Sequence, residues 1–157
     1  MLHKGMTKSE IEKELFGKGD FVQIDYLTRF LKEPLSLDTK KFVFLKLAKV
    51  YEKINMLRDA AKNYNSAAMV SLTFAEKIKH FTKEAEIYIK AADFEKSEEA
   101  MKKAMLEANS VQRNEIFTTI KNIYKQQAEI FEKNLKRIHA VKAYEKLVEM
   151  RPSESER

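Results

Sequence analysis

The chain repeats a pattern of small and aromatic residues at fixed spacings, and this repetition limits the folds that it can adopt. The pattern is clearest over residues 47–67 and 85–104, where its members are Leu47, Ala48, Tyr51, Ala60, Tyr64 and Ala67, then Ala85, Tyr88, Ala100, Met101 and Ala104. Small residues at helical spacing let two helices approach closely, and aromatic residues fill the space between them. The sequence therefore predicts paired helices that recur along the chain, as in a helical repeat array.

Composition supports an all-α fold in a single domain. The chain has 157 residues, of which 44% are hydrophobic, so it is about one domain long and can bury a core. Its 3 glycines and 2 prolines are too few for the many tight turns of an all-β protein. We expect about eight helices stacked as one domain over residues 1–157, with a polar C-terminal tail at 153–157.

The repeated residues resemble those of a known family. A unit that starts at residue 41 has small residues at its eighth, twentieth and twenty-seventh positions, namely Ala48, Ala60 and Ala67. In this the chain resembles the tetratricopeptide repeat, a helix-turn-helix unit of about 34 residues. Similar units cover about 41–74, 78–111 and 121–154, and a degenerate hairpin covers 5–37. The resemblance implies a right-handed solenoid of antiparallel helical hairpins, an α–α superhelix made irregular by its uneven spacing.

The resemblance also implies a concave groove, lined by the second, fifth, ninth and twelfth positions of each unit's first helix. These residues are Phe42, Leu45, Lys49, Glu52, Lys79, Thr82, Glu86, Ile89, Asn122, Lys125, Glu129 and Glu132. Such a mixture of apolar and charged side chains suits a peptide or a helix, with Phe42, Leu45 and Ile89 as apolar anchors. The Lys, Asn and Arg set by which the family's chaperone-binding members hold a terminal carboxylate is incomplete, which disfavours a chaperone tail. We expect a non-enzymatic interaction module or scaffold that binds a protein partner.

No residue pattern in the sequence predicts a reaction centre. The three histidines, His3, His80 and His139, lie far apart, and none has a second ligand at metal-binding spacing. The sequence holds no cysteine, phosphate-binding glycine loop or nucleophile motif. We therefore expect no catalytic residue, no metal site and no cofactor, so that the chain is not an enzyme.

A cluster of basic residues supports an alternative function. The chain carries 30 Lys and Arg against 24 Asp and Glu, a formal net charge of +6. The excess gathers on the second predicted helical pair, in the possible patch Lys46, Lys49, Lys53, Arg58 and Lys62. A basic face attracts phosphates, so the alternative is a helical protein associated with nucleic acid.

The predicted last helix, over residues 135–150, has two apolar faces. Ala140, Tyr144 and Leu147 are expected to face the core, while Ile138, Val141 and Val148 form a second stripe. An apolar stripe that stays exposed favours association. We expect this end face to mediate homodimerisation or to dock a partner.

Two features of the sequence bear on its location. No signal-like apolar stretch follows Met1, and no stretch approaches the roughly 18 uncharged apolar residues needed to span a bilayer. Cysteine is absent, so disulfides are excluded. We expect a cytoplasmic protein without membrane insertion.

Overall fold

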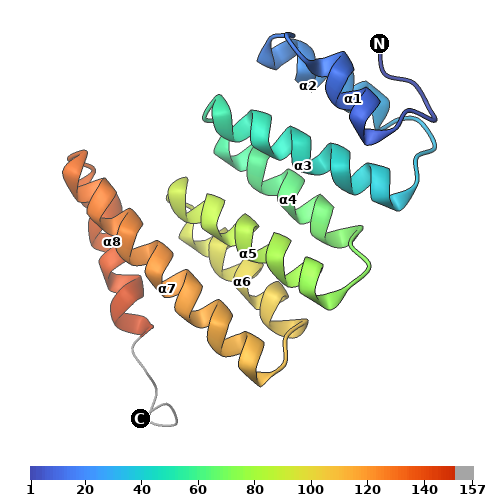
Figure 1. Ribbon diagram of the computed structural model, residues 1–157. Helices are drawn as coiled ribbons and strands as arrows, with labels where there is room; N and C mark the ends of the chain where they lie inside the picture. The colour runs from blue at the N-terminus through green and yellow to red at the C-terminus, as the bar shows by residue number, and fades with distance from the viewer. Residues whose placement is uncertain (151–157) are drawn as a thin grey trace.

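Residues 1–150, the part of the chain that the computed structural model describes, form eight α-helices and no strand (Figure 1). The helices are α1 (Lys8–Leu15), α2 (Asp20–Phe30), α3 (Leu37–Lys53), α4 (Leu57–Met69), α5 (Phe74–Lys90), α6 (Phe94–Leu106), α7 (Ser110–Lys133) and α8 (Arg137–Glu149). They pair into hairpins that follow one another in a row from the N-terminus to the C-terminus. The prediction of an all-α fold is confirmed. The predicted tail 153–157 and the end of the unit 121–154 lie outside the described residues.

The turns inside the last three of these hairpins share one backbone geometry. Asn55, Ala92 and Leu135 have φ angles of 61°, 60° and 59°, in the left-handed region. The next backbone N–H in each turn donates to a carbonyl five residues earlier, from Met56 to Tyr51, from Asp93 to Tyr88 and from Lys136 to Phe131. This is the hydrogen bond that closes a helix in a Schellman motif. The hairpins therefore repeat one another in local structure as well as in sequence.

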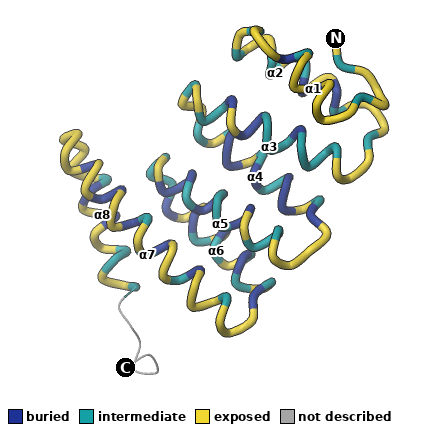
Figure 2. The backbone as a smooth tube through the Cα atoms, viewed as in Figure 1, coloured by how far each residue is buried: buried dark blue, intermediate teal, exposed yellow. Residues whose placement is uncertain are grey.

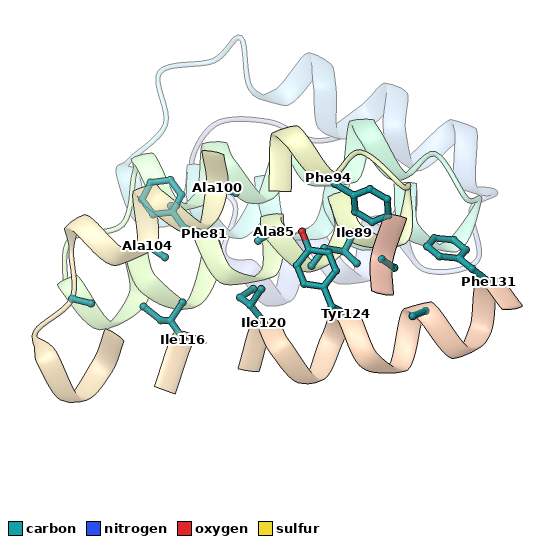
Figure 3. Packing of buried hydrophobic residues seen from close by; sticks show 14 of the residues in the cluster. Phe81, Ala85, Ile89, Phe94, Ala100, Ala104, Ile116, Ile120, Tyr124 and Phe131 are labelled. Carbon is teal, nitrogen blue, oxygen red and sulfur yellow. The ribbon is translucent and has the colours of Figure 1, made fainter. Parts of the chain in front are cut away.

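The core follows the row of hairpins as three clusters of buried residues, which lie where neighbouring helices face one another (Figure 2). The largest cluster joins Ala68 of α4 to helices α5 to α8, with Ile89, Phe94, Ile120, Tyr124 and Phe131 among its members (Figure 3). Two smaller clusters join α1 and α2 to α3, and α3 and α4 to α5. Each hairpin is thus stabilised both by the packing of its own two helices and by contacts with its neighbours in the row.

Most of the predicted core positions are buried, but Tyr51, Met101 and Leu147 are only partly buried and Tyr144 is exposed. Ala60, Ala85 and Ala104 are fully buried, which lets the paired helices approach closely. Tyr144 was expected in the core but is 39% exposed, so that prediction is wrong. It lies on α8, the last helix of residues 1–150, and its hydroxyl donates to Glu132 instead of packing inside.

Candidate functional site

A cavity of about 460 Å³ opens between α3 and α5. We call it the α3–α5 groove, and its lining residues are Glu12, Phe42, Leu45, Lys46, Lys49, Tyr64, Lys79, His80, Thr82, Lys83 and Glu86. The predicted groove residues Phe42, Leu45 and Lys49 of one unit thereby face Lys79, Thr82 and Glu86 of the next. The structure brings two of the predicted rows of side chains together in one hollow.

Helical geometry explains why these side chains share the groove. Phe42, Leu45 and Lys49 are spaced by three and four residues along α3, which places them on one face of that helix. The corresponding residues of α5 have the same spacing. Helix α4 packs against both α3 and α5 and so holds the two faces in position. Side-chain caps fix where each groove helix begins, since Ser36 accepts from the Thr39 N–H and Thr73 from the Glu76 N–H.

Tyr64 of α4 contributes an aromatic ring to the groove and links it to α3. The residue is 4% exposed, and its hydroxyl donates to the Glu52 carboxylate. Burial, together with this hydrogen bond to Glu52, raises the pKa of Tyr64, so the phenol stays neutral. Glu52 was predicted to line the groove but is engaged by Tyr64, and its carboxylate lies 4.0 Å from the Lys83 ammonium.

Lysine side chains give the groove a surplus of positive charge. The Lys46 ammonium lies 2.9 Å from the Glu12 carboxylate, and that of Lys83 lies 3.1 Å from Glu86. Lys49 and Lys79 are exposed and have no salt-bridge partner among residues 1–150. These two ammonium groups are therefore available to an anionic ligand.

Two titratable groups in the groove are held in defined protonation states. Burial raises the pKa of Glu86, but hydrogen bonds from Lys90 and Lys83 outweigh this effect and hold the pKa below its usual value. Burial, with a contribution from Lys79, lowers the pKa of His80. At neutral pH Glu86 is ionised and His80 is uncharged, so the positive charge of the groove comes from its lysines.

The prediction of Ile89 as a groove anchor is wrong. Its side chain is fully buried, in the cluster that also contains Phe94, Tyr124 and Phe131 (Figure 3). The cause is α7, a helix of 24 residues that packs against α5 and helps to enclose this side chain. An isoleucine at that position supports the core and cannot reach a ligand.

The predicted groove residues of the third unit lie apart from the α3–α5 groove. Asn122, Lys125 and Glu129 are exposed on α7 and are absent from the lining of the cavity. Glu132 accepts the hydrogen bond from Tyr144. A role for these α7 residues in binding stays a prediction.

The predicted basic patch is divided between separate surfaces, and most of its charges are paired. Lys46 is paired with Glu12, as described above. The Lys53 ammonium lies 3.1 Å from the Asp20 carboxylate, and the Arg58 guanidinium lies 3.1 Å from the Asp93 carboxylate. Lys46 and Lys49 line the α3–α5 groove, whereas Arg58 lines other hollows of the surface. Lys62 is exposed on α4. The charge available to one phosphate-bearing ligand is smaller than the sequence suggests.

The predicted end-face residues Ile138, Val141 and Val148 are all exposed on α8. Their side chains occupy the side of the helix opposite Ala140 and Ala143, which are buried against the rest of the domain. These side chains are therefore accessible within residues 1–150, and their predicted role in association stays a prediction.

Sequence reasoning missed several residues of the groove, for different reasons. Tyr64 was assigned to the core alone, although a ring between two hairpins can also form part of a surface hollow. Lys83 was omitted, although its spacing from Lys79 and Glu86 places it on the same helix face. Glu12 reaches the groove because α1 packs near α3, and no local pattern signals such a long-range contact.

The structure gives no support for a metal site or a membrane span. Among residues 1–150, no group of three or more His, Asp or Glu residues is placed to hold a metal ion. None of the helices in that range combines the length and apolar character needed to cross a bilayer.

Comparison of the chain with protein-family models, with curated proteins and with solved structures finds no match.

Proposed function

We propose that the chain is a non-enzymatic interaction module, built as a tetratricopeptide-like right-handed solenoid, that binds a peptide segment of a partner protein. The binding site is the α3–α5 groove. The supporting observation is that side chains of α3 and α5 face one another across this groove. They are Phe42, Leu45 and Lys49 of α3, and Lys79 and Glu86 of α5. Two rigid helices with an open space between them can receive an extended segment or a helix without costly reordering of the module.

The groove favours a segment that combines an apolar residue with acidic neighbours. Phe42, Leu45 and Tyr64 offer apolar surface, and burial of one large apolar side chain contributes about 1.5–3 kcal/mol. Lys49 and Lys79 lie beside this surface, and their ammonium groups have no salt-bridge partner among residues 1–150. Carboxylates next to the anchor would pair with them and fix the register of the segment. The groove has a volume of about 460 Å³, which is similar to that of pockets that bind small molecules. It can therefore hold a few side chains of a peptide.

Selection of peptides from a random display library against the purified chain tests this function. We expect enrichment of peptides in which an apolar residue is flanked by Asp or Glu. Leu45→Glu should abolish binding of the selected peptide, because it places a charge on the apolar surface of the groove. Leu72→Glu, at an exposed leucine outside the groove, is the matched control and should bind normally. Enrichment of peptides that bind both variants equally would contradict the proposal.

A second pair of variants separates the groove from the nucleic-acid alternative. Lys49→Glu changes an exposed lysine of the groove and Lys62→Glu an exposed lysine outside it, and both belong to the predicted basic patch. Peptide binding in the groove predicts a loss of affinity for Lys49→Glu alone. Equal loss of oligonucleotide binding in both variants, with steep salt dependence and no peptide binding, would favour the alternative. Both positions are exposed, so neither change should prevent folding.

A further inference from the structure

His80 of α5 is a buried histidine whose ring has no partner in the wall of the α3–α5 groove. The residue is 7% exposed and lines the cavity. Its ring makes no hydrogen bond within residues 1–150, yet the one side-chain polar atom there that is fully buried without a partner is the Oγ1 atom of Thr82. The ring nitrogens of His80 therefore keep some contact with solvent, where the residue lines the groove. A buried polar group in this state can still form a hydrogen bond with a ligand.

Two lysines lie beside His80 on the same wall of the groove. Lys79 directly precedes it in α5, and Lys83 follows it by three residues, so the three nitrogen-bearing side chains line the groove together. Lys83 pairs with Glu86, whereas Lys79 has no salt-bridge partner among residues 1–150. A carboxylate that enters the groove at this wall would meet the charge of Lys79 and the imidazole of His80 together.

The charged groups around His80 and the groove come from three helices, and lysines outnumber carboxylates among them. They are Glu76, Lys79, Lys83 and Glu86 of α5, Lys41, Lys46 and Lys49 of α3, and Glu12 of α1. Tyr64 of α4 is a neutral phenol. On the other side of α5, Glu115 of α7 lines a separate hollow that includes Lys79 but not His80. In the free protein, burial and then Lys79 lower the pKa of His80, and Glu76 opposes them.

We propose, as an extension that rests on the peptide-binding function, that His80 contacts an acidic side chain of the bound segment and takes up a proton from solvent as it does so. In the free protein, burial and the neighbouring lysines disfavour the charged imidazole. A carboxylate against the ring favours the charged form instead. The imidazolium then donates a charge-assisted hydrogen bond to the carboxylate, which is stronger than a neutral one. Peptide binding and protonation of His80 are thus coupled.

The direction of the pH dependence follows from this coupling. The bound carboxylate raises the pKa of His80 above its value in the free protein. Affinity for the peptide therefore increases as pH falls through the pKa of the bound form, and it stops increasing below the pKa of the free form. Asp and Glu side chains of a peptide stay ionised above about pH 5, so the ligand keeps its charge while His80 titrates.

Isothermal titration calorimetry with the peptide selected by display tests the coupling. Between about pH 8 and pH 5.5 we expect the affinity to rise at least about threefold. Titrations at one pH in buffers of different ionisation enthalpy should show that the complex takes up a proton from the buffer. A second peptide, with its acidic residues replaced by the corresponding amides, should bind more weakly and without pH dependence.

A pair of histidine variants assigns the proton to one residue. His80→Gln keeps a side chain that can form hydrogen bonds but does not titrate, so its affinity for the peptide should not change with pH. His139→Gln changes a half-buried histidine of α8 outside the groove, and as the matched control it should keep the pH dependence. The ring signals of the original chain, which has only three histidines, provide a readout by NMR that needs no substitution. Addition of peptide should move the titration curve of His80 to higher pH and leave those of His3 and His139 in place.

Each other outcome has a distinct meaning. A peptide that binds in the groove with pH-independent affinity and no proton uptake would overturn the role of His80 and leave the peptide-binding function intact. A pH dependence that persists in His80→Gln would assign the proton to another group, such as the buried Glu84. Binding that weakens in acid would contradict the coupling directly. A chain that enriches no peptide at any pH would overturn the peptide-binding function and this inference together.

Discussion

The α5–α6 hairpin and the α7–α8 hairpin share one turn geometry but differ in how many of their faces are buried. In α5, Ile87 and Ile89 are both fully buried although they belong to different core clusters, so this helix is packed from two sides. In α8, Ala143 is fully buried while Val148 is 56% exposed, so only one side is packed within residues 1–150. Burial in such a row therefore depends on how many neighbours a hairpin has, and the last hairpin of residues 1–150 has a neighbour on one side and leaves apolar side chains exposed on the other.

Truncation of one apolar side chain in each hairpin, buried in the first and exposed in the second, should give the largest contrast. Ile89→Ala leaves a cavity in a fully buried site and should lower the free energy of unfolding by about 4 kcal/mol. Val148→Ala removes methyl groups that are largely exposed in the monomer and should cost less than about 0.5 kcal/mol. Chemical denaturation at a concentration that keeps the protein monomeric measures both. Similar losses of unfolding free energy in the two variants would show that the two hairpins are not packed differently at these positions.

Loss of the buried ion pair in the α5–α6 hairpin should also destabilise the protein more than loss of an ion pair of α8. The difference in stability should be smaller than for the apolar side chains. Lys103 of α6 lies 3.0 Å from the carboxylate of Glu84, whose side chain is only 6% exposed, and also donates to Asn65. Lys103→Met would strand this buried carboxylate, and we expect a loss of about 3 kcal/mol in the free energy of unfolding at neutral pH. Lys146 of α8 pairs with Glu98 at a partly exposed site, so Lys146→Met should cost less than about 1 kcal/mol.

The pH dependence of the Lys103→Met variant provides a further check. Burial already raises the pKa of Glu84, and Lys103 opposes that rise. Without Lys103 the pKa rises further, so the folded variant keeps a proton that the unfolded chain releases. Its stability relative to the original protein therefore falls as pH increases above the usual Glu range and recovers on acidification. Denaturation of both proteins across this pH range should show a gap that widens with pH, and a constant gap would contradict the assignment.

Removal of a buried hydroxyl in the interior hairpin should stabilise the protein. The Oγ1 atom of Thr82 is buried without a hydrogen-bond partner among residues 1–150. Thr82→Val keeps the shape of the side chain and removes the unpaired group, so we expect a gain of about 1 kcal/mol in the free energy of unfolding. Thr118→Val, on the exposed side of α7, is the control and should change stability by less than about 0.5 kcal/mol. A destabilised Thr82→Val variant would show that the hydroxyl has a partner.

The smallest effect is expected at the turns that the hairpins share. Leu135 has a φ of 59° and Asn55 a φ of 61°, and leucine tolerates this left-handed region less well than asparagine. Leu135→Gly should therefore raise the free energy of unfolding by about 0.5 kcal/mol, after allowance for the flexibility of glycine in the unfolded chain. Asn55→Gly should be nearly neutral. Thermal unfolding measures the stability of both variants. A larger gain for Asn55→Gly than for Leu135→Gly would argue against backbone strain at Leu135.

Much of the helical architecture could be predicted because its signals are local. The spacing of Ala60, Ala85 and Ala104 indicates where helices approach closely, and each of these residues is fully buried. Ile89 and Tyr144 were assigned wrongly because their environment depends on which helix covers them. Ile89 is enclosed by α7, and Tyr144 lies on α8, the last helix of residues 1–150. Neither environment follows from the local sequence. Helical periodicity specifies a face of a helix but not the element that packs against it.

The candidate groove was predictable in part for the same reason. Phe42, Leu45 and Lys49 share a helix face by spacing alone, and the resemblance to a repeat family indicated that this face lines a groove. The contribution of Glu12 and the pairing of Lys53 and Arg58 with acidic residues depend on contacts between distant segments. These contacts decide which lysines have no salt-bridge partner among residues 1–150, and so which charges the proposed ligand would meet.

The proposed function is tested most directly by locating where on the chain a peptide binds. Backbone NMR of the chain, titrated with a peptide selected by display, would locate the site residue by residue. If the peptide binds in the α3–α5 groove, the amide signals of Phe42, Lys49 and Thr82 should shift in a saturable manner, while those of Val141 and Val148 should stay in place. Shifts confined to α8, or a selected peptide that moves no signal of α3 and α5, would contradict it.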